Sequence, residues 1–206
     1  MDLKRIADDA KNGVVRTYYD NGELKSRANY KNDKLDGLFE EWGDKGQLQS
    51  MVSYKDGKLD GLYESWYDNG QLESRVNYKD GKRDGLRESW GGNGKPEERA
   101  NYKDDKLEGV REVWYGNGMP YERTNYKDGE RNGLREYWCA DGQLKERETY
   151  KDGKLDGLCE TWYDGGQLES RAIYKNDKLD GLRETWLENG KLWTRTNYKD
   201  GVKQQN

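Results

Sequence analysis

The stretch Y-K-D-G-K-L-D-G-L-Y-E-S-W-Y-D-N-G-Q-L-E-S-R-V-N-Y, from Tyr54 to Tyr78, decides the fold, because nearly all of the chain repeats it. A tryptophan recurs every 24 residues without a missing position, at Trp42, Trp66, Trp90, Trp114, Trp138, Trp162 and Trp186. Two glycine columns, which contain Gly61 and Gly70, keep the same period. A constant period without insertions predicts a stacked array of repeats.

The composition of the 206-residue chain indicates an ordered protein with a thin core. Charged residues make up 38% of the chain and its mean hydropathy is -1.41, values that are typical of disorder when taken alone. However, eight tryptophans and sixteen tyrosines recur at fixed positions, and each ring can bury roughly 150–250 Å². The formal net charge of -4 is small, so we expect no general attraction to nucleic acid or to an anionic membrane.

The chain divides into a cap, an array and a tail. In residues 1–12, Leu3, Ile6 and Ala10 follow a helical spacing, which predicts a short capping helix over the edge of the first hairpin. Residues 13–201 form the repeat array. Residues 202–206 are polar and carry no pattern, so we expect a flexible tail.

Each repeat predicts one β-hairpin. The segments from Gly61 to Tyr67 and from Gln71 to Tyr78 alternate with a period of two, as strands do, and Asp68-Asn69-Gly70 between them is a strong turn signal. Eight such hairpins are too many strands for a flat open sheet, which rarely exceeds ~10 strands without curling. The predicted fold class is therefore all-β, an elongated, curved, single-layer antiparallel sheet.

The register within a hairpin depends on the length of the turn. A three-residue turn places Trp66 opposite Leu72 and gathers the apolar residues on one face, but it also sets arginines of facing strands opposite each other. A two-residue turn pairs Glu64 with Arg75 and splits the apolar set. We favour the three-residue turn, because burial of an aromatic row outweighs exposed ion pairs of ~0.2–1 kcal/mol each.

The strand that precedes this turn requires a bulge. Leu59 and Leu62 are an odd number of residues apart, so both reach one face only if the strand bulges between them. Gly61 lies at this point, where a glycine permits the bulge.

The repeat sequence resembles a known family. The pattern G-K-L-D-G-L-x-E-x-W-Y-x-N-G-Q-L, as in residues 57–72 and 153–168, resembles the variant MORN repeat found in proteins of the YwqK antitoxin family, and the similarity runs from about Val14 to Gly201. The period is one residue longer than in the standard MORN unit, and Tyr63 stands where its second glycine would be. The resemblance implies antiparallel hairpins and a binding role, either scaffolding or toxin neutralisation, and it offers no catalytic residues.

Catalysis and cofactor binding are not expected. The chain contains no histidine, which removes the usual nucleophile activators and the commonest transition-metal ligand. Neither glycine column precedes a predicted helix, so no phosphate-binding loop is present. Cys139 and Cys159 occupy different positions of neighbouring repeats and are predicted to be free thiols. Together with the lack of a signal-like or membrane-spanning apolar run, this predicts a cytoplasmic protein without cofactors or metals.

Three charged columns are the candidate binding residues, and the tryptophan column is the predicted structural core. In the favoured register, two arginine columns lie together on the face opposite the tryptophans and form a stripe suited to an acidic partner, unless in-plane glutamates neutralise it. These arginines are Arg75, Arg99, Arg123 and Arg147 in one column and Arg87, Arg111 and Arg135 in the other. A glutamate column beside the tryptophans suits a basic ligand or simply keeps the strands soluble. These glutamates are Glu64, Glu88, Glu112 and Glu136.

The function predicted from the sequence is non-enzymatic binding of another protein along the sheet, as in an antitoxin or immunity-type inhibitor. A general cytosolic scaffold is one alternative, and a module that binds a cell wall or a phospholipid surface is another. Neither nucleic acid nor a metal is an expected partner. The sequence does not indicate the oligomeric state.

Overall fold

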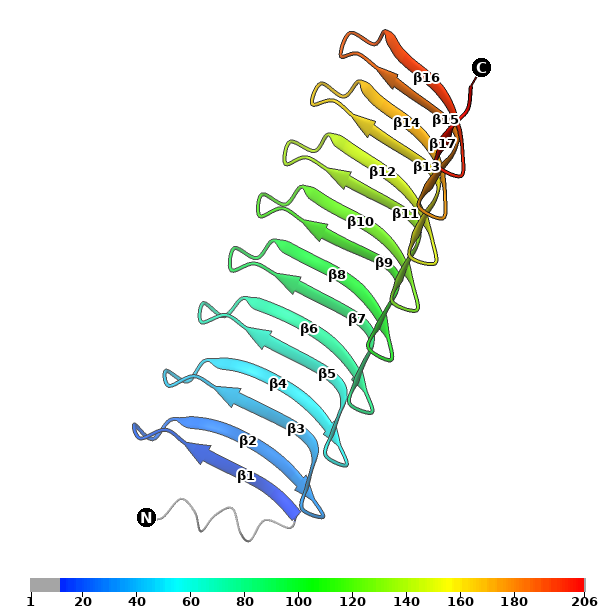
Figure 1. Ribbon diagram of the computed structural model, residues 1–206. Coiled ribbons are helices and arrows are strands. Elements are labelled where there is room, and N and C mark those ends of the chain that lie inside the picture. Colours follow the sequence, from blue (N-terminus) through cyan, green and yellow to red (C-terminus); the bar gives the residue numbers. More distant parts are fainter. Residues whose placement is uncertain (1–11, 206) are drawn as a thin grey trace. The chain divides into compact units, whose positions relative to one another are not determined.

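The computed structural model describes residues 12–205 and shows an all-β chain (Figure 1). Its 17 strands form an open antiparallel sheet, and no helix occurs among these residues. The capping helix predicted for residues 1–12 falls outside the described residues, except for Asn12, which begins the first strand and is not helical. The predicted all-β hairpin array is thus confirmed over the described part of the chain.

The chain forms two compact units, which are described separately. The first comprises Met1–Pro96 and Tyr102–Asp105, and the second comprises Glu97–Asn101 and Lys106–Asn206. The strands of the first unit are β1 (Asn12–Tyr18), β2 (Leu24–Lys31), β3 (Lys34–Trp42), β4 (Leu48–Lys55), β5 (Lys58–Trp66), β6 (Leu72–Lys79) and β7 (Lys82–Trp90). Each strand from β1 to β6 pairs with the next strand in the sequence.

The second unit has the same up-and-down order. Its strands are β9 (Lys106–Trp114), β10 (Pro120–Lys127), β11 (Glu130–Trp138), β12 (Leu144–Lys151), β13 (Lys154–Trp162), β14 (Leu168–Lys175), β15 (Lys178–Trp186), β16 (Leu192–Lys199) and β17 (Val202–Lys203). β8 (Pro96–Lys103) is divided between the units. The segment predicted to be a flexible tail contributes β17, in which Val202 pairs with Lys199.

The turn inside each hairpin has the predicted three residues. In the repeat that holds β5 and β6, the amide of Tyr67 donates to the carbonyl of Gln71 over 2.9 Å, which closes the loop around Asp68, Asn69 and Gly70. The amide of Gly70 donates back to the carbonyl of Tyr67 over 2.8 Å. Gly70 has a φ of 81°, a conformation that favours glycine, so the turn glycine column is required by the backbone.

The register predicted from this turn is nevertheless wrong beyond the first pair. Trp66 faces Leu72 as expected, but a bulge follows on β6, and Ser65 faces Ser74. The residue added by the bulge compensates for the third residue of the turn, so Glu64 faces Arg75 and Tyr63 faces Val76. The predicted opposition of like charges is therefore absent where the pairing is described: Arg123 faces Glu112, Arg147 faces Glu136 and Arg195 faces Glu184.

The bulge predicted at Gly61 is confirmed. Between β4 and β5, Tyr54 pairs with Leu59 and Val52 pairs with Tyr63, so three residues of β5 lie opposite one residue of β4. Gly61 has a φ of 114° at this point. A side chain there would meet the facing strand, because an added Cβ would lie 3.1 Å from the Cβ of Ser53. The glycine therefore serves both the backbone angle and the close approach.

The register defines two faces of the sheet. We call the side that carries the Trp66, Glu64 and Arg75 columns the tryptophan face, and the side that carries the Tyr63, Ser74 and Val76 columns the valine face. The most buried apolar residues lie in the Val76 column and are at most 6% exposed: Ala28, Val52, Val76, Ala100 and Ala172. The tryptophan column, predicted as the structural core, is only half-buried throughout.

Alternate repeats are joined by a tyrosine that the 24-residue pattern does not predict. The hydroxyl groups of Tyr19, Tyr67, Tyr115 and Tyr163 each donate to the carbonyl of the tryptophan in the following repeat, over 2.8–2.9 Å. The same column holds Gly43, Gly91, Cys139 and Leu187 in the intervening repeats. The array is therefore built from pairs of repeats, with a tyrosine only in the first repeat of each pair.

Candidate functional site: the charged columns of the two faces

On the tryptophan face, arginines and glutamates of facing strands neutralise one another. Arg75 lies 2.8 Å from Glu64, and Arg147 lies 3.0 Å from Glu136. The Arg75 column was predicted to lie opposite the glutamate column, on the other face, and this is wrong because the bulge on the second strand shifts the register by one residue. Other pairs on this face are Arg27–Glu40, Arg123–Glu112, Arg171–Glu160 and Arg195–Glu184.

The two arginine columns do not form one stripe. Arg87 faces Val76 on the valine face, whereas Arg75 lies on the tryptophan face, where Glu88 of β7 faces it. Arg111 and Arg135 belong to the Arg87 column and face Thr124 from either side. Arg99 belongs to the Arg75 column by its place in the repeat. The predicted stripe of adjacent arginine columns is therefore wrong. The same one-residue shift in register explains the error.

The valine face differs between the two units. In the first unit most of its residues are uncharged, such as Tyr63, Ser74 and Val76, and Glu41 and Arg87 are charged exceptions. In the second unit, charged residues fill the same positions of successive repeats. We call this set the ion ladder; it consists of Glu98, Arg111, Glu122, Arg135, Glu146 and Glu148.

Arg111 begins the ladder and Arg135 is its centre. Arg111 Nε lies 2.6 Å from Glu98 Oε1, and its Nη1 donates to Glu122 Oε1 over 3.4 Å. Arg135 Nε donates to Glu122 Oε2 over 3.0 Å. Arg135 Nη1 donates to Glu146 over 2.6 Å and to Glu148 over 2.8 Å. One guanidinium thus holds three carboxylates from β10 and β12.

The environment of Arg135 keeps its guanidinium charged. Its side chain is only 15% exposed. Burial opposes the charged form, but hydrogen bonds to Glu146, Glu148 and Glu122 outweigh burial and raise the pKa of Arg135. Such charge-assisted bonds are the strong ones in proteins. The ladder is therefore a hydrogen-bonded array of charges centred on Arg135.

A half-buried tyrosine and a half-buried thiol lie next to Glu148 at the end of the ladder. The hydroxyl of Tyr150 donates to Glu148 over 2.8 Å, and Arg131 donates to the same hydroxyl over 3.2 Å. Burial, together with the hydrogen bond to Glu148, raises the pKa of Tyr150 to about 12. Cys159 faces Glu148 across the strands. Burial, reinforced by the nearby carboxylates, raises the pKa of Cys159 to about 11.

We expect Cys159 to react slowly with alkylating reagents. The thiolate is the reactive form, and a pKa raised from 9.0 to about 11 leaves roughly 100-fold less thiolate at pH 8. In a Cys139→Ser variant, iodoacetamide labelling of the folded protein should be slow at pH 8 and rise steeply as the pH approaches 11. The same variant in 8 M urea is the control and should react like a free thiol. Equal rates in the two conditions would contradict the raised pKa of Cys159.

Thr124 lies at the centre of the ladder with an unpaired hydroxyl. Its side chain is 1% exposed, between Arg111 and Arg135 on the facing strands. Among residues 12–205, no group accepts from or donates to its Oγ1. The same column holds alanine or valine in most repeats. A polar atom without a partner in a buried site costs free energy.

Replacement of this hydroxyl should stabilise the protein. We expect Thr124→Val to raise the free energy of unfolding by about 1 kcal/mol, because it keeps the shape and removes the unpaired group. Thr161→Val is the matched control and should have the opposite sign, since the Thr161 hydroxyl lies 2.8 Å from the Ser170 hydroxyl. Urea unfolding of both variants measures the difference. A loss of stability in Thr124→Val would show that the hydroxyl has a partner.

Three tyrosines lie beside the ladder. The rings of Tyr115 and Tyr121 have centroids 5.0 Å apart, and those of Tyr121 and Tyr137 are 5.2 Å apart, both edge to face. Tyr137 faces Glu122 on one side and Glu146 on the other. Burial, followed by the hydrogen bond and charge of Tyr137, raises the pKa of Tyr115 to about 12. We call these three residues the tyrosine cluster.

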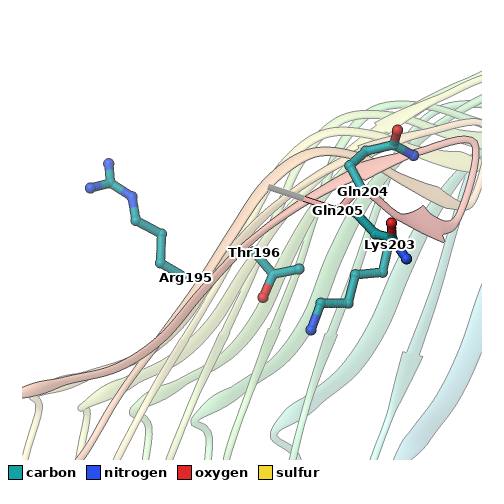
Figure 2. A pocket seen from close by; sticks show the side chains of 5 residues that line it. All are labelled: Arg195, Thr196, Lys203, Gln204 and Gln205. Carbon is teal, nitrogen blue, oxygen red and sulfur yellow. The ribbon is translucent and has the colours of Figure 1, made fainter.

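A hollow elsewhere in the second unit is a weaker candidate for a site. An open polar hollow at the end of the second unit is lined by Arg195, Thr196, Lys203, Gln204 and Gln205. Figure 2 shows Arg195 extending to one side of the strand while Lys203 lies on the other, so the two cations do not converge. Among residues 12–205, no group of histidine, cysteine or acidic residues is arranged to hold a metal. The same residues contain no helix that is long and apolar enough to cross a membrane.

A comparison with protein families identifies the repeats. The family model for the MORN repeat variant matches the chain eight times, at residues 11–32, 35–56, 59–80, 83–104, 107–128, 131–152, 155–176 and 179–200. The chain therefore belongs to the family of MORN repeat variant proteins. No curated protein matches the chain. The resemblance to the YwqK antitoxin family stays a prediction.

Membership of this family gives the general class of function. MORN repeats indicate a repeat protein that interacts with other proteins or with membrane lipids. The repeat pattern is the same in both units, but the ion ladder and the tyrosine cluster occur only where the second unit departs from it. These departures are the features that distinguish this chain from a uniform array.

Proposed function

We propose that this chain is a non-enzymatic, cytoplasmic protein that binds another protein along its sheet, as an antitoxin or immunity-type inhibitor binds its toxin. The MORN repeats support a binding role. The absence of histidine from the sequence supports a role without acid-base catalysis. A binding protein of this kind requires an extended surface with individual features, and the valine face of the second unit has them.

The observation that carries the proposal is the concerted change from uncharged to charged residues on this face. Ion pairs removed from water are weak evidence for stability, since well-packed apolar residues of similar volume often stabilise as well or better. The first unit of the same chain fills these positions with Tyr63, Ser74 and Val76. Folding alone therefore does not require the ion ladder, and binding of a partner explains its presence.

Affinity capture tests this function. The tagged chain is expressed in the native cells, and the captured proteins are identified by mass spectrometry. A single nuclease-like or deaminase-like partner supports neutralisation, whereas several unrelated partners support the alternative of a general scaffold. Retention of lipid or glycan alone contradicts both.

A designed variant locates the partner on the valine face. The ladder variant combines Glu122→Ser, Arg135→Tyr, Glu146→Ser and Glu148→Val, which are the residues that the first unit has in these columns. It should lose the partner while it stays folded. A control variant with Glu184→Ser and Arg195→Ser removes an ion pair of the tryptophan face and should retain the partner. If the ladder variant retains the partner and the control variant loses it, binding is assigned to the tryptophan face.

A further inference from the structure

We propose that the tryptophan face of the second unit carries a further binding site, where Glu112, Trp114 and Trp138 bind the guanidinium group of an arginine from a protein partner. This inference goes beyond the proposed function, because the site lies on the opposite face from the ion ladder. Its observations are a hollow between the two rings, a loosely held glutamate, and two repeats in which an arginine of the chain itself occupies the equivalent position.

The hollow lies between two tryptophans and has a volume of about 190 Å³. Trp114, Pro120 and Trp138 line it, and Pro120 lies directly opposite Trp114 on the neighbouring strand. Proline occurs in this column only at residues 96 and 120, and the other repeats have leucine, namely Leu24, Leu48, Leu72, Leu144, Leu168 and Leu192. Leu72 is half-buried opposite Trp66, whereas Pro120 is exposed. The smaller proline leaves space that a leucine side chain would fill.

Glu112 borders this hollow and is held more loosely than other glutamates of its column. Its side chain is 33% exposed, and its ion pair with Arg123 spans 3.7 Å. Glu64, Glu136 and Glu160 are 7–14% exposed and lie 2.8–3.0 Å from their arginines. The carboxylate of Glu112 can therefore reach a ligand from solvent.

The first unit shows how an arginine binds to a glutamate and a tryptophan of this face. Arg27 forms an ion pair with Glu40, and its guanidinium lies 5.9 Å from the centre of the Trp42 ring. A guanidinium is attracted both by a carboxylate and by the face of an indole ring. Glu112 and Trp114 have the same spacing, with one residue between them.

The second unit contains a second example, in which the glutamate holds two arginines. Arg147 lies 3.8 Å from Glu160 and 5.7 Å from the centre of the Trp162 ring. Glu160 also lies 2.9 Å from Arg171. One carboxylate of this column thus accepts two guanidinium groups, one from each neighbouring strand.

Glu112 and Trp114 lack the first of these two arginines. Within residues 12–205, Glu112 forms an ion pair only with Arg123, and no cation lies over the Trp114 ring. Arg99 is the arginine of the preceding strand, and its interactions are with other residues. A guanidinium from a partner can therefore bind to Glu112 and Trp114 as Arg147 binds to Glu160 and Trp162.

Local geometry, and not an excess of negative charge, selects the ligand. Arg123 balances Glu112, and the carboxylate of Glu122, which also borders the hollow, is held by Arg111 and Arg135 in the ion ladder. What remains is one side of a carboxylate next to two indole rings. A planar guanidinium suits this arrangement better than a compact ammonium group. Membrane lipids carry no guanidinium, so this chemistry indicates a protein.

Nuclear magnetic resonance of the full chain tests the inference. The probe is a glycine-arginine-glycine tripeptide, acetylated and amidated at its ends. We expect it to shift the indole N–H signals of Trp114 and Trp138, which are assigned with Trp→Phe variants. The same tripeptide with citrulline, which has the shape of arginine without its charge, should bind at least about threefold more weakly.

Two variants locate the site. Glu112→Gln removes the charge and keeps the shape, and Pro120→Leu fills the hollow with the residue that six other repeats have there. Each should weaken binding of the arginine tripeptide about threefold or more. Glu160→Gln is the matched control, because Glu160 belongs to the same column and already holds two arginines. It should bind the tripeptide like the unmodified chain.

Four outcomes overturn the inference, with all variants folded as judged by circular dichroism. One is the absence of a shift in the Trp114 and Trp138 signals. Another is equal affinity for the arginine and citrulline tripeptides. A third is equal affinity of the unmodified chain and Pro120→Leu, which would place the tripeptide outside the hollow. The last is tighter binding of phosphocholine than of the tripeptide, which would assign the rings to a lipid headgroup.

Discussion

Replacement of Arg135 by methionine should lower the free energy of unfolding by about 3–5 kcal/mol. The substitution leaves Glu122, Glu146 and Glu148 close together without the cation that all three contact. Removal of one partner from a desolvated ion network is costly, because the remaining charges repel one another and each loses a hydrogen-bond donor. Urea unfolding monitored by tryptophan fluorescence measures the loss. Arg195→Met is the control and should cost less, about 1 kcal/mol, since the Arg195 side chain is 64% exposed and pairs with a single carboxylate, that of Glu184.

The ladder variant tests why Arg135→Met loses stability. The cause is either the three carboxylates left without their cation or the loss of the ladder's charges as such. It removes Arg135 together with Glu122, Glu146 and Glu148, and it restores the residue types of the first unit. We expect its stability to lie within about 1 kcal/mol of the unmodified chain, or above it, because tyrosine and valine replace two of the desolvated charges with apolar surface and serine removes the other two. A loss as large as that of Arg135→Met alone would show that the ladder itself holds this unit together.

The sequence was sufficient to predict the hairpins, their turns and one of the two bulges, because glycine marks these positions. Gly70 has a positive φ in the turn and Gly61 has one in the bulge, and both recur in every repeat. No glycine indicates the second bulge, at Glu73, because the residue in its column varies from repeat to repeat. The register was therefore predicted from the turn alone and was shifted by one residue.

This shift also explains which binding residues were assigned incorrectly. A displacement by one residue moves a side chain to the other face. Arg75 therefore lies on the tryptophan face with Glu64, whereas Arg111 and Arg135 lie on the valine face. The glutamates of the ladder were not singled out at all. Their signal was nevertheless present in the sequence, where Glu98, Glu122 and Glu146 replace serine in one column of successive repeats.

The burial of the faces could not be predicted from residue type. Large rings suggested that the tryptophan column is the core, but a single-layer sheet leaves both of its faces in contact with solvent. The small residues of the Val76 column are the most buried, and longer side chains such as Tyr63 occupy the position directly opposite them on the neighbouring strand. Burial here depends on the neighbours of a column, and these follow from the register.

Replacement of Gly157 by alanine should lower the free energy of unfolding by about 2–3 kcal/mol. Gly157 has a φ of 127°, which residues with a side chain rarely adopt, and an added Cβ would lie 3.0 Å from the Cβ of Thr149 on the facing strand. Gly190→Ala is the control, because Gly190 also has a positive φ but has nothing within 4 Å of an added Cβ. It should cost about 1 kcal/mol. Thermal or urea unfolding of the two variants isolates the effect of the close approach, and equal losses would mean that the bulge opens to admit a side chain.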